Sequence, residues 1–309
     1  MSSQYDAWIG RTESRTEDLH ASVVQAMAAT LDVPAAREGE PLPAGWQWLF
    51  FNPVVPRSGL GDDGHPRRGG FLPPIDLPRR MWAGSRLRYL ADLPVGAQAT
   101  RESRILGVQH KVGKRGALWF VTLRHTIACE GEARIVEEQD IVYREASPPG
   151  AAAAVRSAAQ SAAQPASPPA VQPRARSAAQ PNAAAAPPAH EAQAQWSQPF
   201  APDPVLLFRY SALTFNGHRI HYDQDYARQV EGYPDLVVHG PLTATLLQRF
   251  AVDRGGGRAL ARFEFRGVSP LFVSRAFRLE GREADDGSLE LWARGPDGEL
   301  AVSAVAAFR

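Results

Sequence analysis

The stretch Gly240-Pro-Leu-Thr-Ala-Thr-Leu-Leu-Gln-Arg-Phe250 predicts a helix that needs a sheet to cover it. Proline is favoured in the first turn of a helix, and Pro241 stands where this helix would begin. Four apolar residues then share one face at helical spacing: Leu242, Leu246, Leu247 and Phe250. The segments that follow are strand-like, at 261–266, 275–283, 289–293 and 300–305, with a turn at 295–298. We therefore expect an antiparallel sheet packed on one helix.

The N-terminal half repeats this plan. A helix-compatible stretch at 16–31 precedes a Pro/Gly-rich aromatic segment at 41–78. Strand-like segments follow at 86–90, 99–105, 117–127 and 134–143, with a hairpin turn at 113–116. Arg86-Leu-Arg-Tyr and Arg262-Phe-Glu-Phe occupy matching positions in the two halves, which is a faint internal duplication.

Between the halves, residues 147–199 contain no Leu, Ile, Phe or Met and consist largely of Ala, Pro, Ser and Gln. Such a segment buries too little apolar surface to offset the entropy of ordering it, so we predict a disordered linker. The chain then divides into an N-terminal domain at 1–146, the linker at 147–199 and a C-terminal domain at 200–309.

Composition narrows the classes of function. The 309 residues include 34 basic and 33 acidic side chains, and a net charge of +1 gives no excess field for nucleic acid or an anionic membrane. The single cysteine, Cys129, excludes an intramolecular disulfide and fits a reducing compartment. Since we also find no apolar signal segment and no run long enough to span a membrane, we predict a cytoplasmic protein.

Three of the eight histidines, His218, His221 and His239, lie between positions 218 and 239. A neutral histidine such as His221 can take a proton from water and return it, while Asn216 and His218 can position that water. Gly240 precedes the helix start at Pro241, so its N–H would have no partner within the helix and could stabilise an oxyanion. This combination favours addition of water to an activated double bond.

Other interpretations of these residues remain open. The histidines could be satisfied loop residues, and we favour that interpretation for His239, which would orient the loop. A metal site made of His218, His221, Asp223 and His239 matches no zinc spacing, so we expect no metal and no other cofactor. Asp223 and Asp225 are expected to cap the short helix at Tyr226.

Arg79, Arg80 and Trp82, with the segment 111–115, offer cations and an aromatic ring for phosphates and an adenine. Solvated turn charges and a core tryptophan explain them equally well. Dinucleotide-binding, phosphate-loop and serine-hydrolase motifs are not found in the sequence, which leaves the corresponding chemistries without support.

Two segments, Thr214-Phe-Asn-Gly-His-Arg-Ile-His-Tyr-Asp223 and Val237-Val-His-Gly-Pro-Leu242, resemble the MaoC-like, hot-dog-fold acyl-thioester hydratases and dehydratases. The branch resembled contains 3-methylfumaryl-CoA (mesaconyl-C4-CoA) hydratase, itaconyl-CoA hydratase and hydroxyacyl-thioester dehydratase type 2. The N-terminal half fits it through Gly64-His-Pro, Gly69-Gly-Phe-Leu-Pro-Pro74, Leu77-Pro-Arg-Arg-Met-Trp-Ala-Gly84 and Glu138-Gln-Asp-Ile-Val-Tyr-Arg144.

The resemblance implies an α+β double hot-dog fold: two antiparallel sheets, each wrapped around a central helix, with the reactive residues in the C-terminal half. The wider family carries Gly-Asp-x-Asn-Pro-x-His, whose Asp, Asn, Pro and His correspond to Asn216, His218, Arg219 and His221. Only the final histidine matches. The carboxylate base is missing at Asn216, so more of the proton transfer falls to His221, whereas the oxyanion-hole glycine corresponds to Gly240.

The expected function is therefore cofactor-free, reversible hydration of a 2-enoyl thioester to the 3-hydroxyacyl thioester, including branched or dicarboxylic chains. Its substrate would be carried on CoA or on an acyl carrier protein. A hot-dog thioesterase and a non-catalytic acyl-thioester binding module are the alternatives. The sequence leaves monomer and homodimer equally open.

Overall fold

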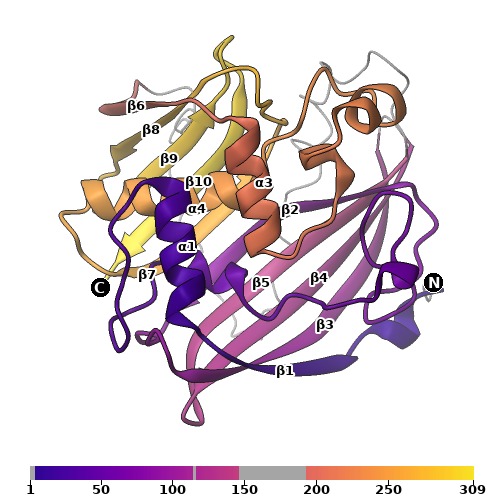
Figure 1. Cartoon of the computed structure of the whole chain (residues 1–309), viewed down its shortest axis with the longest axis horizontal. Helices are drawn as coiled ribbons and strands as arrows, with labels where there is room; N and C mark the ends of the chain where they lie inside the picture. The colour runs from indigo at the N-terminus through magenta and orange to yellow at the C-terminus, as the bar shows by residue number, and fades with distance from the viewer. Residues whose placement is uncertain (1–3, 114–115, 146–192) are drawn as a thin grey trace, which may run out of the picture.

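The computed structural model describes residues 4–113, 116–145 and 193–309, in which ten strands form one antiparallel sheet (Figure 1). The strand order is β1-β3-β4-β5-β2-β7-β10-β9-β8-β6. The strands are β1 (Thr12–Asp18), β2 (Arg79–Tyr89), β3 (Gln98–Gly113), β4 (Gly116–Cys129), β5 (Glu132–Arg144), β6 (Trp196–Phe200), β7 (Leu260–Gly267), β8 (Phe277–Glu283), β9 (Leu289–Arg294) and β10 (Leu300–Phe308). Each half of the chain supplies five neighbouring strands, as the two predicted sheets require.

The two half-sheets meet edge to edge at β2 and β7. Their register pairs Arg86 with Glu264, Leu87 with Phe263 and Arg88 with Arg262. These are the segments whose similarity indicated an internal duplication, so the duplicated strands pair with each other about a local two-fold. Because β2 and β7 each gain a ladder of backbone hydrogen bonds, the inner edge of each half-sheet is closed within one chain.

Three helices lie on one side of the sheet (Figure 1): α1 (Ala21–Leu31), α3 (Pro204–Leu213) and α4 (Gly240–Arg254). α4 is the predicted helix of the C-terminal half, and its Leu242 and Leu247 are fully buried in the main core together with residues of β7 to β10. Burying one leucine side chain contributes about 1.5–3 kcal/mol, so this face anchors the helix on its sheet. α1 is its N-terminal counterpart and buries Val24, Met27 and Ala28.

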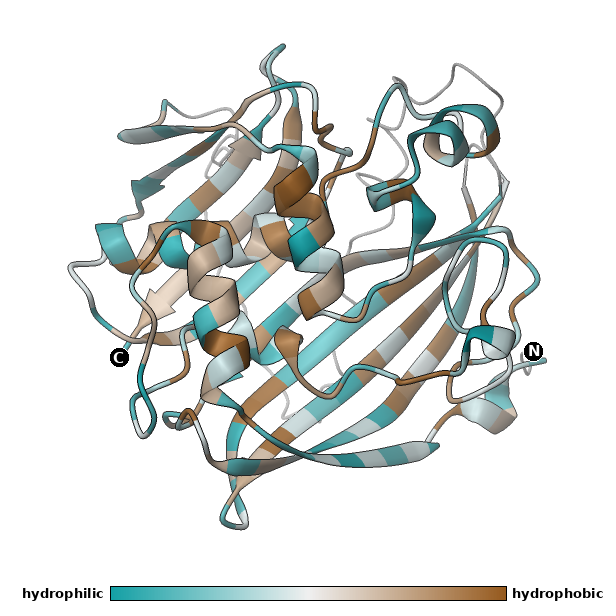
Figure 2. Cartoon of the chain, in the orientation of Figure 1, coloured by the Kyte–Doolittle hydropathy of each residue, from teal (hydrophilic) through white to brown (hydrophobic). Residues whose placement is uncertain are grey.

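Hydrophobic periodicity in the sequence predicted the positions of the strands well and the boundaries of the helices less well. Apolar and polar residues alternate along β3 to β5 (Figure 2), which is the pattern that predicted them. Residues 16–18 were expected in a helix but belong to β1, which pairs with β3 before α1 begins at Ala21. The alternating half-buried pattern of β1 explains this error, because mixed polar residues fit an edge strand as well as a first helical turn.

Two elements around the predicted linker were missed. β6 begins at Trp196, inside the range assigned to the linker, and pairs with β8. α3 follows at once, and Asp203 caps it by accepting a hydrogen bond from the Leu206 N–H at 2.8 Å. Residues 146–192 of the linker and the turn residues 114–115 lie outside the described residues. None of the helices described could span a membrane.

Candidate active site

The histidine cluster lies on the irregular chain that connects α3 to α4. This segment contains the short helices η6 (Arg219–His221) and η7 (Tyr226–Val230), the second of which is a π-helix. Asp223 accepts a hydrogen bond from the Tyr226 N–H at 3.0 Å, which confirms its predicted capping role. Asp225 stands at the N-cap position of η7, as predicted, but its side chain makes no capping bond there. The Asp223 carboxylate accepts from the first helical N–H in its place.

His221 is buried, and its environment fixes its tautomer. Its Nδ1 lies 2.7 Å from the backbone oxygen of Val237. A carbonyl oxygen only accepts, so Nδ1 carries the hydrogen and Nε2 keeps a free lone pair. Burial lowers the pKa of His221 to about 4, with the hydrogen bond to Val237 opposing the shift. At neutral pH His221 is therefore an uncharged imidazole able to accept a proton.

His239 lies directly beneath His221. The two rings stack with their centroids 3.6 Å apart and their planes at 18°, and His239 is only 1% exposed. Its Nε2 is 2.8 Å from the Ser211 hydroxyl of α3. Burial lowers the pKa of His239 well below its ordinary value, so this ring is also neutral. The stacking and the hydrogen bond to Ser211 fix the position of the His239 ring against His221.

Asn216 and His218 form the turn before η6. The Asn216 side-chain oxygen accepts a hydrogen bond from the His218 N–H at 3.0 Å, an arrangement typical of an Asx turn. His218 meets the ring of His221 edge-on, with centroids 5.4 Å apart. His218 therefore lies within the cluster, whereas the carbonyl end of the Asn216 amide is occupied in shaping the loop.

Sequence reasoning missed two members of this cluster, Asp63 and His65, which come from the N-terminal half. His65 stacks against His218 with ring centroids 4.0 Å apart, and its Nδ1 lies 3.1 Å from the Asp63 carboxylate. The backbone oxygen of Asp63 accepts from the Arg219 N–H at 2.9 Å. The segment Gly64-His-Pro contributed to the family resemblance, and it was the available signal.

Gly240 is the first residue of α4, as the oxyanion-hole prediction requires. It is exposed, and a Cβ built on it would meet no atom within 4 Å. Its N–H belongs to the first turn, where helical geometry offers no acceptor. Exposure, open space and the positive end of the helix dipole all favour an oxyanion at this N–H.

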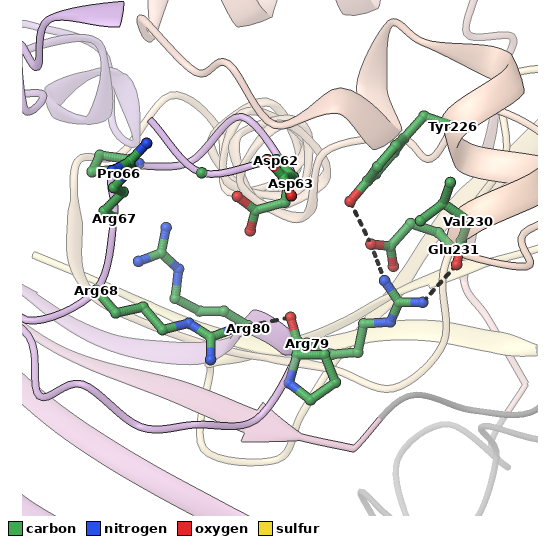
Figure 3. Close-up of a pocket in the computed structure, with 12 residues that line it drawn as sticks. Asp62, Asp63, Pro66, Arg67, Arg68, Arg79, Arg80, Tyr226, Val230 and Glu231 are labelled. Atoms are coloured by element: carbon green, nitrogen blue, oxygen red, sulfur yellow. Dashed lines mark hydrogen bonds and ion pairs between the residues drawn. The ribbon is translucent and has the colours of Figure 1, made fainter. Parts of the chain in front are cut away.

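A cavity of ≈ 590 Å³ adjoins Asp63 and is lined by four arginines: Arg67, Arg68, Arg79 and Arg80 (Figure 3). Arg79 forms an ion pair with Glu231 and donates to the Val230 oxygen at 2.9 Å. Arg80 points into the cavity, and its charge lowers the pKa of both His65 and His218, after the larger effect of burial. Arg80 thus lies beside the histidines, as Arg68 does beside His65, whereas Arg79 is held by its own partner.

Trp82 does not line this cavity. Its indole N–H donates to the Gly84 oxygen and the Ser85 hydroxyl, at 3.1 and 2.9 Å, and its ring packs edge-on against Trp48. These contacts fit the core interpretation of Trp82 and give no support to stacking on an adenine. Of the segment 111–115, residues 114 and 115 lie outside the described part of the chain.

The four residues weighed as metal ligands are not assembled as such. Asp223 is engaged by Arg219 at 2.8 Å, and His221 and His239 stack face to face rather than converging on one point. A different triple converges in the described part of the chain: one atom each of Asp63, His65 and His218, all within 4.8 Å of one another. The site therefore combines loops from both halves of the chain.

Comparison with known proteins places the chain among acyl-thioester enzymes. The family model for hydroxyacyl-thioester dehydratase type 2 matches residues 45–175 and 170–273. The chain is 45% identical to mesaconyl-C(4)-CoA hydratase of Chloroflexus aurantiacus, over 98% of each chain. It is 29% identical to the mitochondrial hydroxyacyl-thioester dehydratase type 2 of Schizosaccharomyces pombe, over 77% of each.

Solved structures confirm the predicted fold. A MaoC-like dehydratase superposes with a TM-score of 0.66 at 16% identity, covering 98% of this chain and 99% of its own. A protein of Mycobacterium tuberculosis described as a double hotdog fold gives a TM-score of 0.52 at 14% identity, over 96% and 95% of the two chains. The fold is therefore an α+β double hot dog whose two half-sheets are continuous.

Proposed function

Because the chain belongs to the family of type 2 hydroxyacyl-thioester dehydratases, we propose that it reversibly hydrates a 2-enoyl-CoA thioester whose acyl chain bears a second carboxylate. It is a hydro-lyase, and the substrate named for its 45% identical relative is a CoA thioester with such a carboxylate. The observation that carries the proposal is the fixed tautomer of His221, whose neutral Nε2 is free to act as a base.

The reaction assigns one step to each of two groups. The water oxygen bonds to the β-carbon while His221 Nε2 takes a water proton, and the double-bond electrons move onto the thioester oxygen. The Gly240 N–H binds the resulting enolate oxygen. When the enolate collapses, the α-carbon takes the proton from His221, which restores the neutral imidazole. Water is added across the double bond, and no oxidant or reductant is consumed.

We propose Arg80, rather than Arg79 or Trp82, as the substrate-binding residue of the cavity. The second carboxylate of the acyl chain would lie beside the β-carbon, and Arg80 lies beside the histidine cluster without the ion pair that occupies Arg79. An arginine that receives a carboxylate forms charge-assisted hydrogen bonds of about 1.5–3 kcal/mol. Arg80 would thus select dicarboxylic over simple acyl chains.

Replacing Arg80 by Met is expected to lower kcat/KM for mesaconyl-C4-CoA by roughly 10- to 100-fold, which corresponds to the loss of one charged hydrogen-bonded contact. Turnover of crotonyl-CoA, which lacks the second carboxylate, should change little. Arg282→Met, on the distant β8 strand and paired with Glu290, is the control. An equal loss on both substrates would instead place Arg80 against the CoA moiety.

Gly240→Ala is expected to lower kcat/KM by about 10- to 100-fold without changing the unfolding temperature. The added methyl meets no protein atom, so the fold has nothing to repack, but the methyl projects into the open space beside the N–H. Gly107→Ala is the matched control, because its Cβ also meets nothing and it lies in β3. A Gly240→Ala enzyme as active as Gly107→Ala would remove this N–H from the mechanism.

The direct test of the function is an ultraviolet assay with crotonyl-, 3-methylfumaryl- and itaconyl-CoA, in which free thiol is followed separately. The proposal predicts loss of the enoyl-thioester absorbance without thiol release, fastest for a dicarboxylic substrate. Thiol release would identify a thioesterase. No change in absorbance and no thiol release with any of the substrates would contradict the proposal.

A further inference from the structure

Position 216 of the C-terminal half is an asparagine, yet the site contains a carboxylate, that of Asp63 from the N-terminal half. We propose that Asp63 and His65 of the N-terminal half form, with His218, the binding site for the water that is added to the double bond. Asp63 thereby supplies, from the other half of the chain, the carboxylate that Asn216 lacks. This inference rests on the proposed hydratase function and adds two residues to it.

The spacing of the three side chains fits one water molecule. One oxygen of Asp63 and one ring nitrogen from each of His65 and His218 lie within 4.8 Å of one another. Three atoms at the corners of such a triangle can all be reached from a point about 2.8 Å from each, which is an ordinary hydrogen-bond length. The cluster is therefore wide enough to hold a water oxygen and small enough to fix it.

The polarity of the cluster suits a water nucleophile. Asp63 accepts two hydrogen bonds from His65, from its N–H at 3.0 Å and from Nδ1 at 3.1 Å, so the Nε2 of His65 is left as an acceptor. Burial alone would raise the pKa of Asp63, but the hydrogen bonds from His65 outweigh that effect and hold this pKa well below its usual range. The ionised carboxylate accepts one hydrogen of the water, which leaves the second hydrogen for His221 Nε2 and an oxygen lone pair for the attack.

The same side chains could ligate a cation, but their surroundings oppose one. Arg80 and Arg68 both lie close enough for their positive charges to lower the pKa of His65. A divalent cation placed there would meet that repulsion, whereas an uncharged water would not. Water is the occupant that the local charges favour.

The two halves are locked together at this point. A Cβ on Gly64 would lie 1.8 Å from the backbone oxygen of Gly217, so the two turns touch through their main chains. Two hydrogen bonds from Arg219, to the backbone oxygens of Asp62 and Asp63 at 3.0 and 2.9 Å, secure the contact. Asp63 and His65 are therefore held in place before any substrate arrives, as a water site requires.

The test separates water addition from proton transfer at the α-carbon. We expect Asp63→Asn and His65→Gln each to lower kcat for hydration by about 100-fold with little change in KM. Exchange of the α-protons of butyryl-CoA in D₂O needs His221 and Gly240 but no added water, so it should continue at close to the wild-type rate in both variants. Asp225→Asn and His20→Gln, at exposed positions outside the site, are the controls.

Retained exchange with lost hydration supports the inference. Unchanged hydration overturns it, and so does a parallel loss of hydration and exchange, which would assign the pair to proton transfer or to folding. If a chelator abolished hydratase activity and Zn²⁺ restored it, the cluster would be a metal site instead, which would overturn the inference. The wild-type enzyme tests the proposed hydratase function separately. If it hydrates none of the enoyl-CoA substrates, the proposed function is wrong.

Discussion

His221→Gln is expected to lower kcat for hydration by about 10³-fold or more, because it removes the only base we assign to the proton taken from water. Glutamine can still donate a hydrogen bond to the Val237 oxygen, the bond that His221 Nδ1 makes at 2.7 Å. The buried carbonyl therefore keeps a partner, and the fold should survive. Steady-state kinetics, with thermal unfolding as the check on folding, measure the two effects separately.

Alanine at this position is a harsher change than glutamine. It would leave the Val237 carbonyl without a donor and His239 without its stacking partner, at a cost of about 1–3 kcal/mol in unfolding free energy. The vacated space offers a second measurement, since added imidazole should restore part of the activity of His221→Ala but none of that of a Gly240 variant. A fully active His221→Gln enzyme would exclude His221 as the base.

Gly64→Ala is expected to lower both stability and hydration strongly, with kcat falling by at least about 100-fold. Gly64 has a φ of +84°, which penalises any L side chain, and its new methyl would collide with the backbone of Gly217. Relieving that collision requires the two turns to separate, which withdraws Asp63 and His65 from His218. Kinetics and thermal unfolding on the same preparation measure the result.

A matched variant distinguishes the contact from the backbone penalty. Gly287 has a similar φ of +78°, but a Cβ there would meet no atom within 4 Å. Gly287→Ala should therefore lose only the roughly 1 kcal/mol of left-handed backbone strain and keep its activity. If Gly64→Ala behaved like Gly287→Ala, the closeness of the two halves would be irrelevant to catalysis.

Local periodicity explains what was predictable from the sequence. The start of α4 was placed to within one residue because Pro241 marks it and because leucine and phenylalanine side chains recur at helical spacing after it. His221 and Gly240 could be proposed because each lies in a short segment whose chemistry is local. α3 was missed because its start lies beside the linker, whose Ala/Pro-rich composition predicts disorder.

Long-range contacts explain the rest. Asp63 and His65 precede His218 by 155 and 153 positions in the sequence, and no spacing rule connects them. Arg79 and Arg80 are chemically identical in the sequence, and only the position of Glu231 shows which of them is already paired. The side-chain oxygen of Asn216 holds a local turn, and its predicted role in positioning water stays a prediction.

The seam between β2 and β7 determines how this protein can be divided. Cutting the connection between the halves would leave their backbone ladder and the contact of Gly64 with Gly217 intact, because neither depends on chain continuity. Synthesising one half alone would instead expose the inner edge of its sheet, with the unpaired amides that promote aggregation. Each half thus covers the sheet edge of the other. Mutations that weaken the pairing of β2 with β7 should therefore lower solubility before they lower activity.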